Sequence, residues 1–246
     1  MSRVSILVSI FAFAYTADVI AQIEPKMVPI PEGCAEVGTL LMDPQSSPLR
    51  EVCLGRFLIS QYEITFLEYD IFTNETARAA RNDVGFGRDN RPVIDVNWFD
   101  AVAYAEWLSD KTGKRYRLPT DAEWEYVAKL NTEFGFNYSW GTEYEHAKAN
   151  CRNCGSEWDA RMTAPVGSFE PSLLGVYDMH GNVWEWTSDC YFEDDPKDES
   201  GIHCQIGVVR GGSWDVGADD LVFWKRTQQN SKRPTQDTGF RLVMDP

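Results

Sequence analysis

Two short segments of the chain carry residue types that can do chemistry. The first is Cys151-Arg-Asn-Cys154, whose two thiols can form a disulfide, take part in redox exchange or supply half of a zinc site. No second Cys-x-x-Cys or His-x-x-x-His follows it, and a redox pair normally begins a helix, whereas this pair lies among Asn and Gly residues. The favoured interpretation is therefore a structural disulfide.

The second segment is Gly181-Asn-Val-Trp-Glu185. It can place an Asn side chain, a backbone carbonyl and a Glu carboxylate around one cation at a tight turn, and calcium prefers such oxygen ligands. The same side chains can instead cap the turn through hydrogen bonds alone. The pattern predicts a calcium site and leaves this alternative open.

The N-terminus and the cysteines indicate an exported protein, periplasmic or secreted. Arg3 precedes a short apolar run over residues 4–15, and Ala21 precedes Gln22, which is the pattern of a secretory signal peptide. We expect a signal peptide over 1–21 and a mature domain over 22–246; the alternative is a buried N-terminal strand. Six cysteines in an exported chain favour disulfides. Proximity in the sequence predicts three pairs: Cys34–Cys53, Cys151–Cys154 and Cys190–Cys204.

The composition excludes several classes of partner. The 246 residues include 38 acidic and 23 basic side chains, which leaves a net charge of −15. Binding to nucleic acid or anionic lipid usually needs a basic face, so neither is expected. No segment is long and apolar enough for a membrane span. The 9 Trp, 10 Tyr and 13 Phe instead predict a loop-rich domain with an aromatic core.

Few regular elements hold these segments in place. Helix starts are marked by three capping signals: Thr65 with Glu68, Asn97, and Thr120 with Glu123. Gly113 is expected to end the second helix. Short apolar runs between turn residues predict strands within 27–30, 51–59, 207–210 and 239–243. After residue 131, Gly, Asn, Asp and Pro become frequent, so we expect one α+β domain that is rich in loops.

Five segments occur in an order that resembles the formylglycine-generating enzyme (sulfatase-modifying factor) family. The resemblance extends from about residue 27 to 243 and implies an elaborated C-type-lectin-like domain. The segments are Arg117-Leu-Pro-Thr-Asp-Ala-Glu-Trp-Glu-Tyr126, Thr163-Ala-Pro-Val-Gly-Ser-Phe169, Gly175-Val-Tyr-Asp-Met-His-Gly-Asn-Val-Trp-Glu-Trp186, Arg210-Gly-Gly-Ser-Trp214 and Gly239-Phe-Arg241.

The resemblance also implies that the family's copper chemistry is absent. Formylglycine-generating members hold copper(I) with two cysteines in a Gly-Gly-Ser-Trp-x-Cys-x-x-x-x-Cys run, and those positions fall on Val216 and Leu221 here. A related branch, the ergothioneine-pathway sulfoxide synthases, binds iron through three histidines, mostly from an added helical domain. The three histidines of this chain (His146, His180 and His203) do not suggest such a site, and we expect no added helical domain.

Calcium is the cofactor that the resemblance supports. Family members hold calcium at the segment already noted, which implies ligands from Asn182, the Val183 carbonyl and Glu185. A second family site maps onto Asn150, the Cys151 carbonyl, Asp159 and the Arg161 carbonyl, although its spacing departs from the family pattern.

Two functions remain open. The first is an exported binding module for a protein, peptide or small molecule, because diversified ligand-binding proteins on this fold vary the stretch between residues 214 and 239. The second is a periplasmic oxidoreductase that matures a peptide or small metabolite, as some relatives do without the copper cysteines. The same surface residues are candidates in both cases: Trp214, Asp215, Asp219, Asp220, Trp224, Lys225 and Arg226. A deep pocket with facing titratable groups would favour the enzyme, and an open face would favour the binder.

Overall fold

Local capping signals start the α-helices of this computed structural model, which describes residues 23–40, 48–130, 132, 136–191 and 205–246. Thr65, Asn97 and Thr120 each form a capping box with the residue three positions later, as expected. Gly113 follows the second helix in the left-handed conformation (φ 72°), which glycine adopts without strain. The helices are α2 (Phe66–Glu75), α3 (Trp98–Thr112) and α4 (Asp121–Lys129).

The described strands form two four-stranded sheets and one hairpin. The first sheet is antiparallel and has the order β1 (Met27–Ile30), β4 (Phe57–Ser60), β10 (Val243–Met244), β5 (Tyr116–Arg117). The second has the order β8 (Arg226–Asn230), β7 (Ile206–Arg210), β6 (Trp184–Cys190), β9 (Thr238–Gly239). In this second sheet β9 runs parallel to β6 and the other pairs are antiparallel. The hairpin consists of β2 (Gly33–Val37) and β3 (Arg50–Leu54).

Two predicted strands are each divided between sheets. The run over 51–59 breaks at Gly55, so β3 pairs within the hairpin while β4 joins the first sheet. The run over 239–243 begins in β9 and ends in β10, and its residues Phe240 and Leu242 are buried where the chain passes from one sheet to the other. Because the segment between β9 and β10 is buried on all sides, it is as apolar as a strand. The sequence therefore predicted one continuous strand over residues 239–243.

Aromatic side chains build the main core, as the composition predicted. Tyr69 and Phe72 on α2, Tyr104 on α3 and Phe240 are fully buried, and their ring centroids lie 5.2–6.2 Å apart. Trp186 on β6 lies in the same cluster. The core thus forms between the two helices and the second sheet, and it fixes the frame on which the loops stand.

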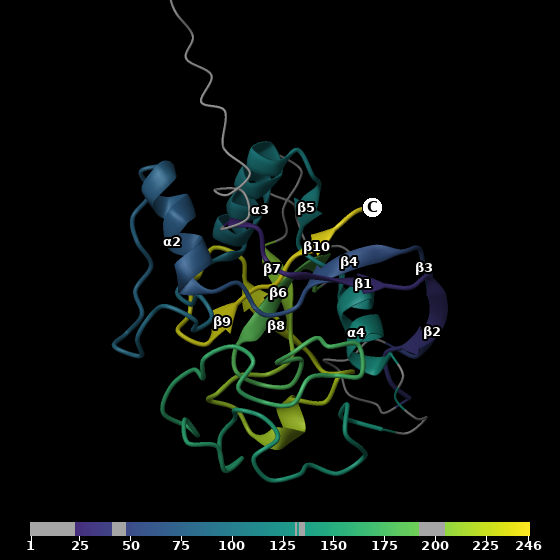
Figure 1. Ribbon diagram of the computed structural model, residues 1–246. Helices are drawn as coiled ribbons and strands as arrows, with labels where there is room; N and C mark the ends of the chain where they lie inside the picture. The colour runs from purple at the N-terminus through teal and green to yellow at the C-terminus, as the bar shows by residue number, and fades with distance from the viewer. Residues whose placement is uncertain (1–22, 41–47, 131, 133–135, 192–204) are drawn as a thin grey trace, which may run out of the picture.

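Long loops fill the lower half of the view in Figure 1. They include the stretch between α4 and β6 and the stretch between β7 and β8, which contains the 3₁₀-helix η1 (Ala218–Asp220). Two predicted disulfides, Cys34–Cys53 and Cys151–Cys154, are confirmed. Cys190 is disulfide-bonded, and Cys204 lies outside the described residues, as does the expected signal peptide. No helix in the described part of the chain is long and apolar enough to cross a membrane.

Candidate functional site

The predicted binding-surface residues divide among several neighbours instead of converging on one pocket. Trp214 is buried and packs edge to face on Phe86, with ring centroids 5.2 Å apart. Asp215 forms an ion pair with Arg152, whose guanidinium lies 3.1 Å from its carboxylate. These contacts join the start of the stretch to the loop that contains the Cys151–Cys154 disulfide.

The middle of the stretch packs on a different loop. Asp219 and Asp220 lie on η1, and the carboxylate of Asp220 is 4.0 Å from the ammonium of Lys225. Trp224 donates a hydrogen bond through Nε1 to the side-chain oxygen of Asn137 at 3.2 Å. The contacts of these residues therefore differ from those of Trp214 and Asp215.

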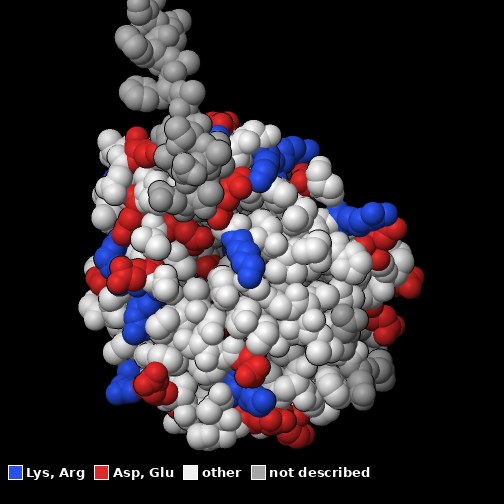
Figure 2. Space-filling model, viewed as in Figure 1, with Lys and Arg blue, Asp and Glu red and all other residues white. Residues whose placement is uncertain are grey.

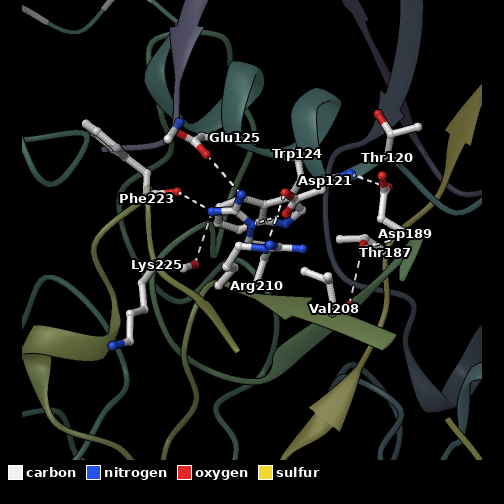
Figure 3. Close-up of polar contacts among 12 residues, drawn as sticks. Thr120, Asp121, Trp124, Glu125, Thr187, Asp189, Val208, Arg210, Phe223 and Lys225 are labelled. Carbon is white, nitrogen blue, oxygen red and sulfur yellow. Dashed lines mark hydrogen bonds and ion pairs between the residues drawn. The ribbon is translucent and has the colours of Figure 1, made fainter. Parts of the chain in front are cut away.

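Arg226 lies 3.6 Å from the carboxylate of Asp121 and so joins a buried charge network. Figure 3 shows the centre of this network, Arg210. The Arg210 guanidinium donates to the carboxylates of Asp121 and Glu125 on α4, and it also donates to two carbonyl groups at 3.1 Å, those of Phe223 and Lys225. Burial opposes the charge of Arg210, but its two carboxylate partners raise its pKa. This network holds the backbone of residues 223–225 in place, so its role is to position that loop.

Val216 and Leu221 lie in an apolar environment. Leu221 is fully buried in a cluster with Cys151 and Cys154, and the half-buried Val216 packs against the same cluster. The backbone N–H of Arg152 donates to the Val216 carbonyl at 2.7 Å, which fixes the two segments together. Neither side chain offers a donor atom for a metal ion.

Glu185, expected to bind calcium at a turn, lies instead on β6, and Arg241 occupies its carboxylate. Arg241 Nε and Nη2 donate to the two Glu185 oxygens at 2.6 and 2.7 Å, and Trp124 Nε1 donates to Oε2 at 2.7 Å. Glu185 and Arg241 are both fully buried. A calcium ion does not fit at Glu185 while this pair holds.

The other predicted calcium ligands lie close together but are also hydrogen-bonded. Asn182 donates its backbone N–H to the Asn150 carbonyl at 2.9 Å, so the two predicted sets are neighbours. The side-chain oxygens of both residues accept hydrogen bonds, from Ala164 N–H and the Ser156 hydroxyl respectively, each at 2.8 Å. Asp159 accepts two backbone N–H groups, Arg161 is exposed, and the Val183 N–H donates to Glu63 at 3.2 Å. No group of three or more His, Cys, Asp or Glu side chains is placed to hold a metal ion among the described residues, and calcium stays a prediction.

Two buried acids were not singled out from the sequence. Glu63 accepts hydrogen bonds from the Asn182 side chain and the Val183 N–H. Burial is the main cause that raises the pKa of Glu63 well above the usual range, and the negative charges of Asp178 and Glu185 raise it further. Asp178 accepts the Gly167 N–H at 2.7 Å through Oδ2, whereas its Oδ1 has no hydrogen-bond partner. Burial raises the pKa of Asp178 to about 6. Its place between Tyr177 and Met179 in a recognised motif was the only available signal.

An open pocket of about 620 Å³ lies between the loops that contain Trp158 and Phe169. Its walls combine aromatic and acidic side chains: Trp158, Phe169, Tyr177, Glu157 and Glu170. A narrow crevice shares Phe169 and Glu170 with this pocket and continues to Trp140, Asp178 and His180. None of these residues was predicted as part of a site, although Phe169, Tyr177, Asp178 and His180 lie within the segments that carry the family resemblance.

His180 is a neutral, buried side chain at the end of the crevice. Its Nε2 accepts the Ser139 N–H at 3.0 Å and its Nδ1 lies 2.8 Å from the Leu221 carbonyl, which places the proton on Nδ1. Burial lowers the pKa of His180 to about 4. These two contacts engage both ring nitrogens of His180.

Charged side chains are unevenly spread over the face shown in Figure 2. Acidic and basic side chains are interspersed along its edges, while the middle of this face carries few of either. No broad basic patch is visible there. The chain as a whole has a net charge of −15.

Comparison with known proteins places these features in a family. A formylglycine-generating enzyme from Streptomyces coelicolor is 39% identical over 188 residues, which cover 68% of this chain and 56% of that protein. The structure of PvdO from Pseudomonas aeruginosa superposes with a TM-score of 0.77 at 32% identity, covering 90% of this chain and 95% of that one. Variable protein 1 of Treponema denticola gives a TM-score of 0.70 at 26% identity, with 89% and 95% coverage.

The match to the family extends over nearly the whole chain, from residue 15 to 246. The chain spans only 26% to 56% of the length of the first curated relatives that it matches. The α+β architecture and the structural neighbours confirm the expected C-type-lectin-like fold. The chain belongs to the family described as the sulfatase-modifying factor enzyme 1-like domain.

Proposed function

We propose that this protein is an exported ligand-binding module of the family that does not generate formylglycine. The observation that carries the proposal is the pair Val216 and Leu221 at the positions assigned to the copper cysteines. Copper(I) requires soft ligands, and two aliphatic side chains supply none. The open pocket beside Trp158, which aromatic and acidic side chains line, supports a binding role for the loops that form it.

The neighbouring cysteines do not replace the missing thiolates. Cys151 and Cys154 lie in the same apolar cluster as Leu221, but they are joined in a disulfide. A disulfide sulfur carries no thiolate charge, and two electrons from an added reductant would be needed to release the ligands. The cluster that could have contained a copper centre therefore serves as packing.

Export is supported by the cysteines and the N-terminal pattern. Disulfides such as Cys34–Cys53 and Cys151–Cys154 form and persist in oxidising compartments. Ile23, two positions after the expected cleavage site, is buried in the main core, so the folded domain keeps its first core residue after cleavage. Removal of residues 1–21 is therefore compatible with the described fold.

The decisive experiment measures formylglycine formation. The protein is incubated with a Cys-x-Pro-x-Arg peptide, copper and oxygen, and the product is followed by mass spectrometry, with the Streptomyces coelicolor enzyme as the positive control. We expect no product. Product at the turnover of the control enzyme would refute the proposal. A V216C/L221C variant that gains copper binding would support the assignment of these positions.

A second candidate function is an oxidoreductase that matures a peptide or small metabolite. It is favoured by the similarity to PvdO, which covers nearly the full length of both chains. Its site would depend on polar groups of the 214–226 stretch, yet Asp215 pairs with Arg152 whereas Arg226 faces Asp121. Substrate-dependent oxygen uptake that is lost in D215N and retained in the surface control E106Q would favour this candidate.

A further inference from the structure

The pocket beside Trp158 has a lining that suits a positively charged organic ligand. Trp158 and Phe169 meet edge to face with ring centroids 6.1 Å apart, and Tyr177 adds a third aromatic wall. Glu157 and Glu170 contribute carboxylates, and neither Lys nor Arg is among the described residues that line this pocket. Aromatic faces and carboxylates both attract a cation, and the rings also bury an apolar body.

A second observation comes from the crevice that adjoins the pocket. Asp178 lines this crevice with only 7% of its surface exposed, and its Oδ1 has no hydrogen-bond partner. A buried carboxylate oxygen without a donor is costly, and a ligand N–H group would satisfy it. Because Phe169 and Glu170 line both the pocket and the crevice, they mark where the two spaces meet.

The nearby basic groups do not cancel this acidic character. Lys148 lines the crevice, but its ammonium lies 3.9 Å from the carboxylate of Glu145. Arg91 interacts electrostatically with Glu157, and its guanidinium donates a hydrogen bond to the Thr163 carbonyl. Arg241 is the cation that acts on Asp178, but its guanidinium is paired with both Glu185 oxygens. Glu170 and Asp178 thus remain as the two acids at the junction of pocket and crevice.

We propose that this pocket binds an organic cation, an ammonium or guanidinium group on an apolar body. The apolar body packs on Trp158, Phe169 and Tyr177, and the charged head lies near Glu170 and donates toward Asp178. A lysine or arginine side chain of a peptide and a free amine share this chemistry. The inference rests on the proposed binding function and adds its ligand class; the net charge of −15 assists the approach of such ligands.

The test is isothermal titration calorimetry of the mature protein with matched probes. Phenethylamine carries the charged head, and phenethyl alcohol replaces it by a neutral hydroxyl. We expect saturable binding of the amine, at least tenfold tighter than the alcohol and weaker at high salt, because screening reduces the attraction of exposed carboxylates. Agmatine and an acetylated arginine methylamide then distinguish a free amine from a peptide side chain as the source.

Matched variants locate the binding. E170Q is expected to weaken amine binding by about five- to tenfold, because it removes one charged contact and keeps the shape. The control E106Q changes an exposed glutamate on α3 and should leave binding unchanged. D178N should abolish the preference for the amine over the alcohol; its melting temperature is recorded because the residue is buried. E170Q, at an exposed position, keeps the test decisive if D178N does not fold.

Several results would overturn the inference. Equal binding of amine and alcohol would remove the cation preference, as would an E170Q affinity that equals that of E106Q. Saturable binding of calcium without binding of either amine or guanidinium probe would assign the acids to a metal instead. The proposed function is tested separately, by the assay for formylglycine formation. Failure of the ligand class in the binding experiments is therefore distinguishable from failure of the proposed function.

Discussion

The substitution Glu185→Gln tests whether the buried carboxylate supports the fold or a calcium ion. In the structure both Glu185 oxygens accept N–H groups, from Arg241 at 2.6 and 2.7 Å and from Trp124 at 2.7 Å. Gln keeps the shape but turns one oxygen into a donor that faces another donor. Arg241 is fully buried, so the substitution also leaves a buried charge without its partner.

The expected loss of stability is large. Removing one partner of a buried ion pair costs about 3–5 kcal/mol. For a domain of this size each kcal/mol lowers the melting temperature by about 2–4 °C, so E185Q should melt about 6–20 °C below the wild type. The exposed control E106Q should change the free energy of unfolding by no more than about 0.5 kcal/mol.

The assay is urea unfolding of wild type and E185Q, each in the presence of a chelator and of calcium. If the ion pair is the cause, the loss is the same in both conditions. If Glu185 holds calcium, the wild type alone gains stability from the ion, about 2.7 kcal/mol at a hundredfold excess over the dissociation constant. A loss below about 1 kcal/mol, or one confined to the calcium condition, would refute the reasoning.

The remaining predictions concern the disulfides, the pH dependence and the N-terminus. Loss of the Cys34–Cys53 bridge, which spans 19 residues, should cost about 3 kcal/mol and loss of the Cys151–Cys154 bridge, which spans 3, about 2, as measured by urea unfolding of the Ala pairs. The reverse order would contradict the chain-entropy argument. Because the pKa of His180 is lowered to about 4, this residue contributes stability that is present above pH 6.5 and lost as the pH falls through 4. Because the pKa of Asp178 is raised to about 6, this residue contributes stability that is present below pH 3.8 and lost as the pH rises through 6. These effects oppose each other, so D178N should steepen the acid loss between pH 6 and 4; an unchanged slope would contradict the assignment. Mass spectrometry of the exported protein should find Gln22 as the first residue, and an intact N-terminus would contradict the signal peptide.

Helix starts were predictable because their causes are local. In each capping box, side chains three residues apart satisfy backbone N–H groups, so the signal is complete within four residues. The strand β6 was not predictable in the same way. Its residue Glu185 resembles a turn ligand in sequence, and the distant Arg241 and Trp124 make a carboxylate tolerable on a buried strand.

The candidate site was even less predictable from the sequence than β6, because it depends on contacts between residues that are distant in the sequence. The stretch from Trp214 to Arg226 was treated as one surface because its residues are adjacent in sequence. In the structure its ends contact Phe86 and Asp121, which belong to different loops and helices. The pocket beside Trp158 arises where two loops meet, and no spacing within either loop specifies that meeting.

Ion pairs link the segments that carry the family resemblance, and those of Arg210 and Arg241 are buried whereas Arg117 is half-buried. Arginines from three of the five segments pair with acids from the same set of segments: Arg117 with Glu123, Arg210 with Asp121 and Glu125, and Arg241 with Glu185. A buried charge must keep its partner, so these residues change only together or at a large cost in stability. They hold β10 to β5, the 223–225 loop to α4 and the C-terminal crossing segment to β6. None of their charged groups lines the pocket. These ion pairs stabilise the scaffold, whereas the proposed ligand would contact loop residues such as Phe169 and Glu170, whose side chains take no part in the pairs. A substitution in the first set should therefore be read out in unfolding, and one in the second set in ligand affinity.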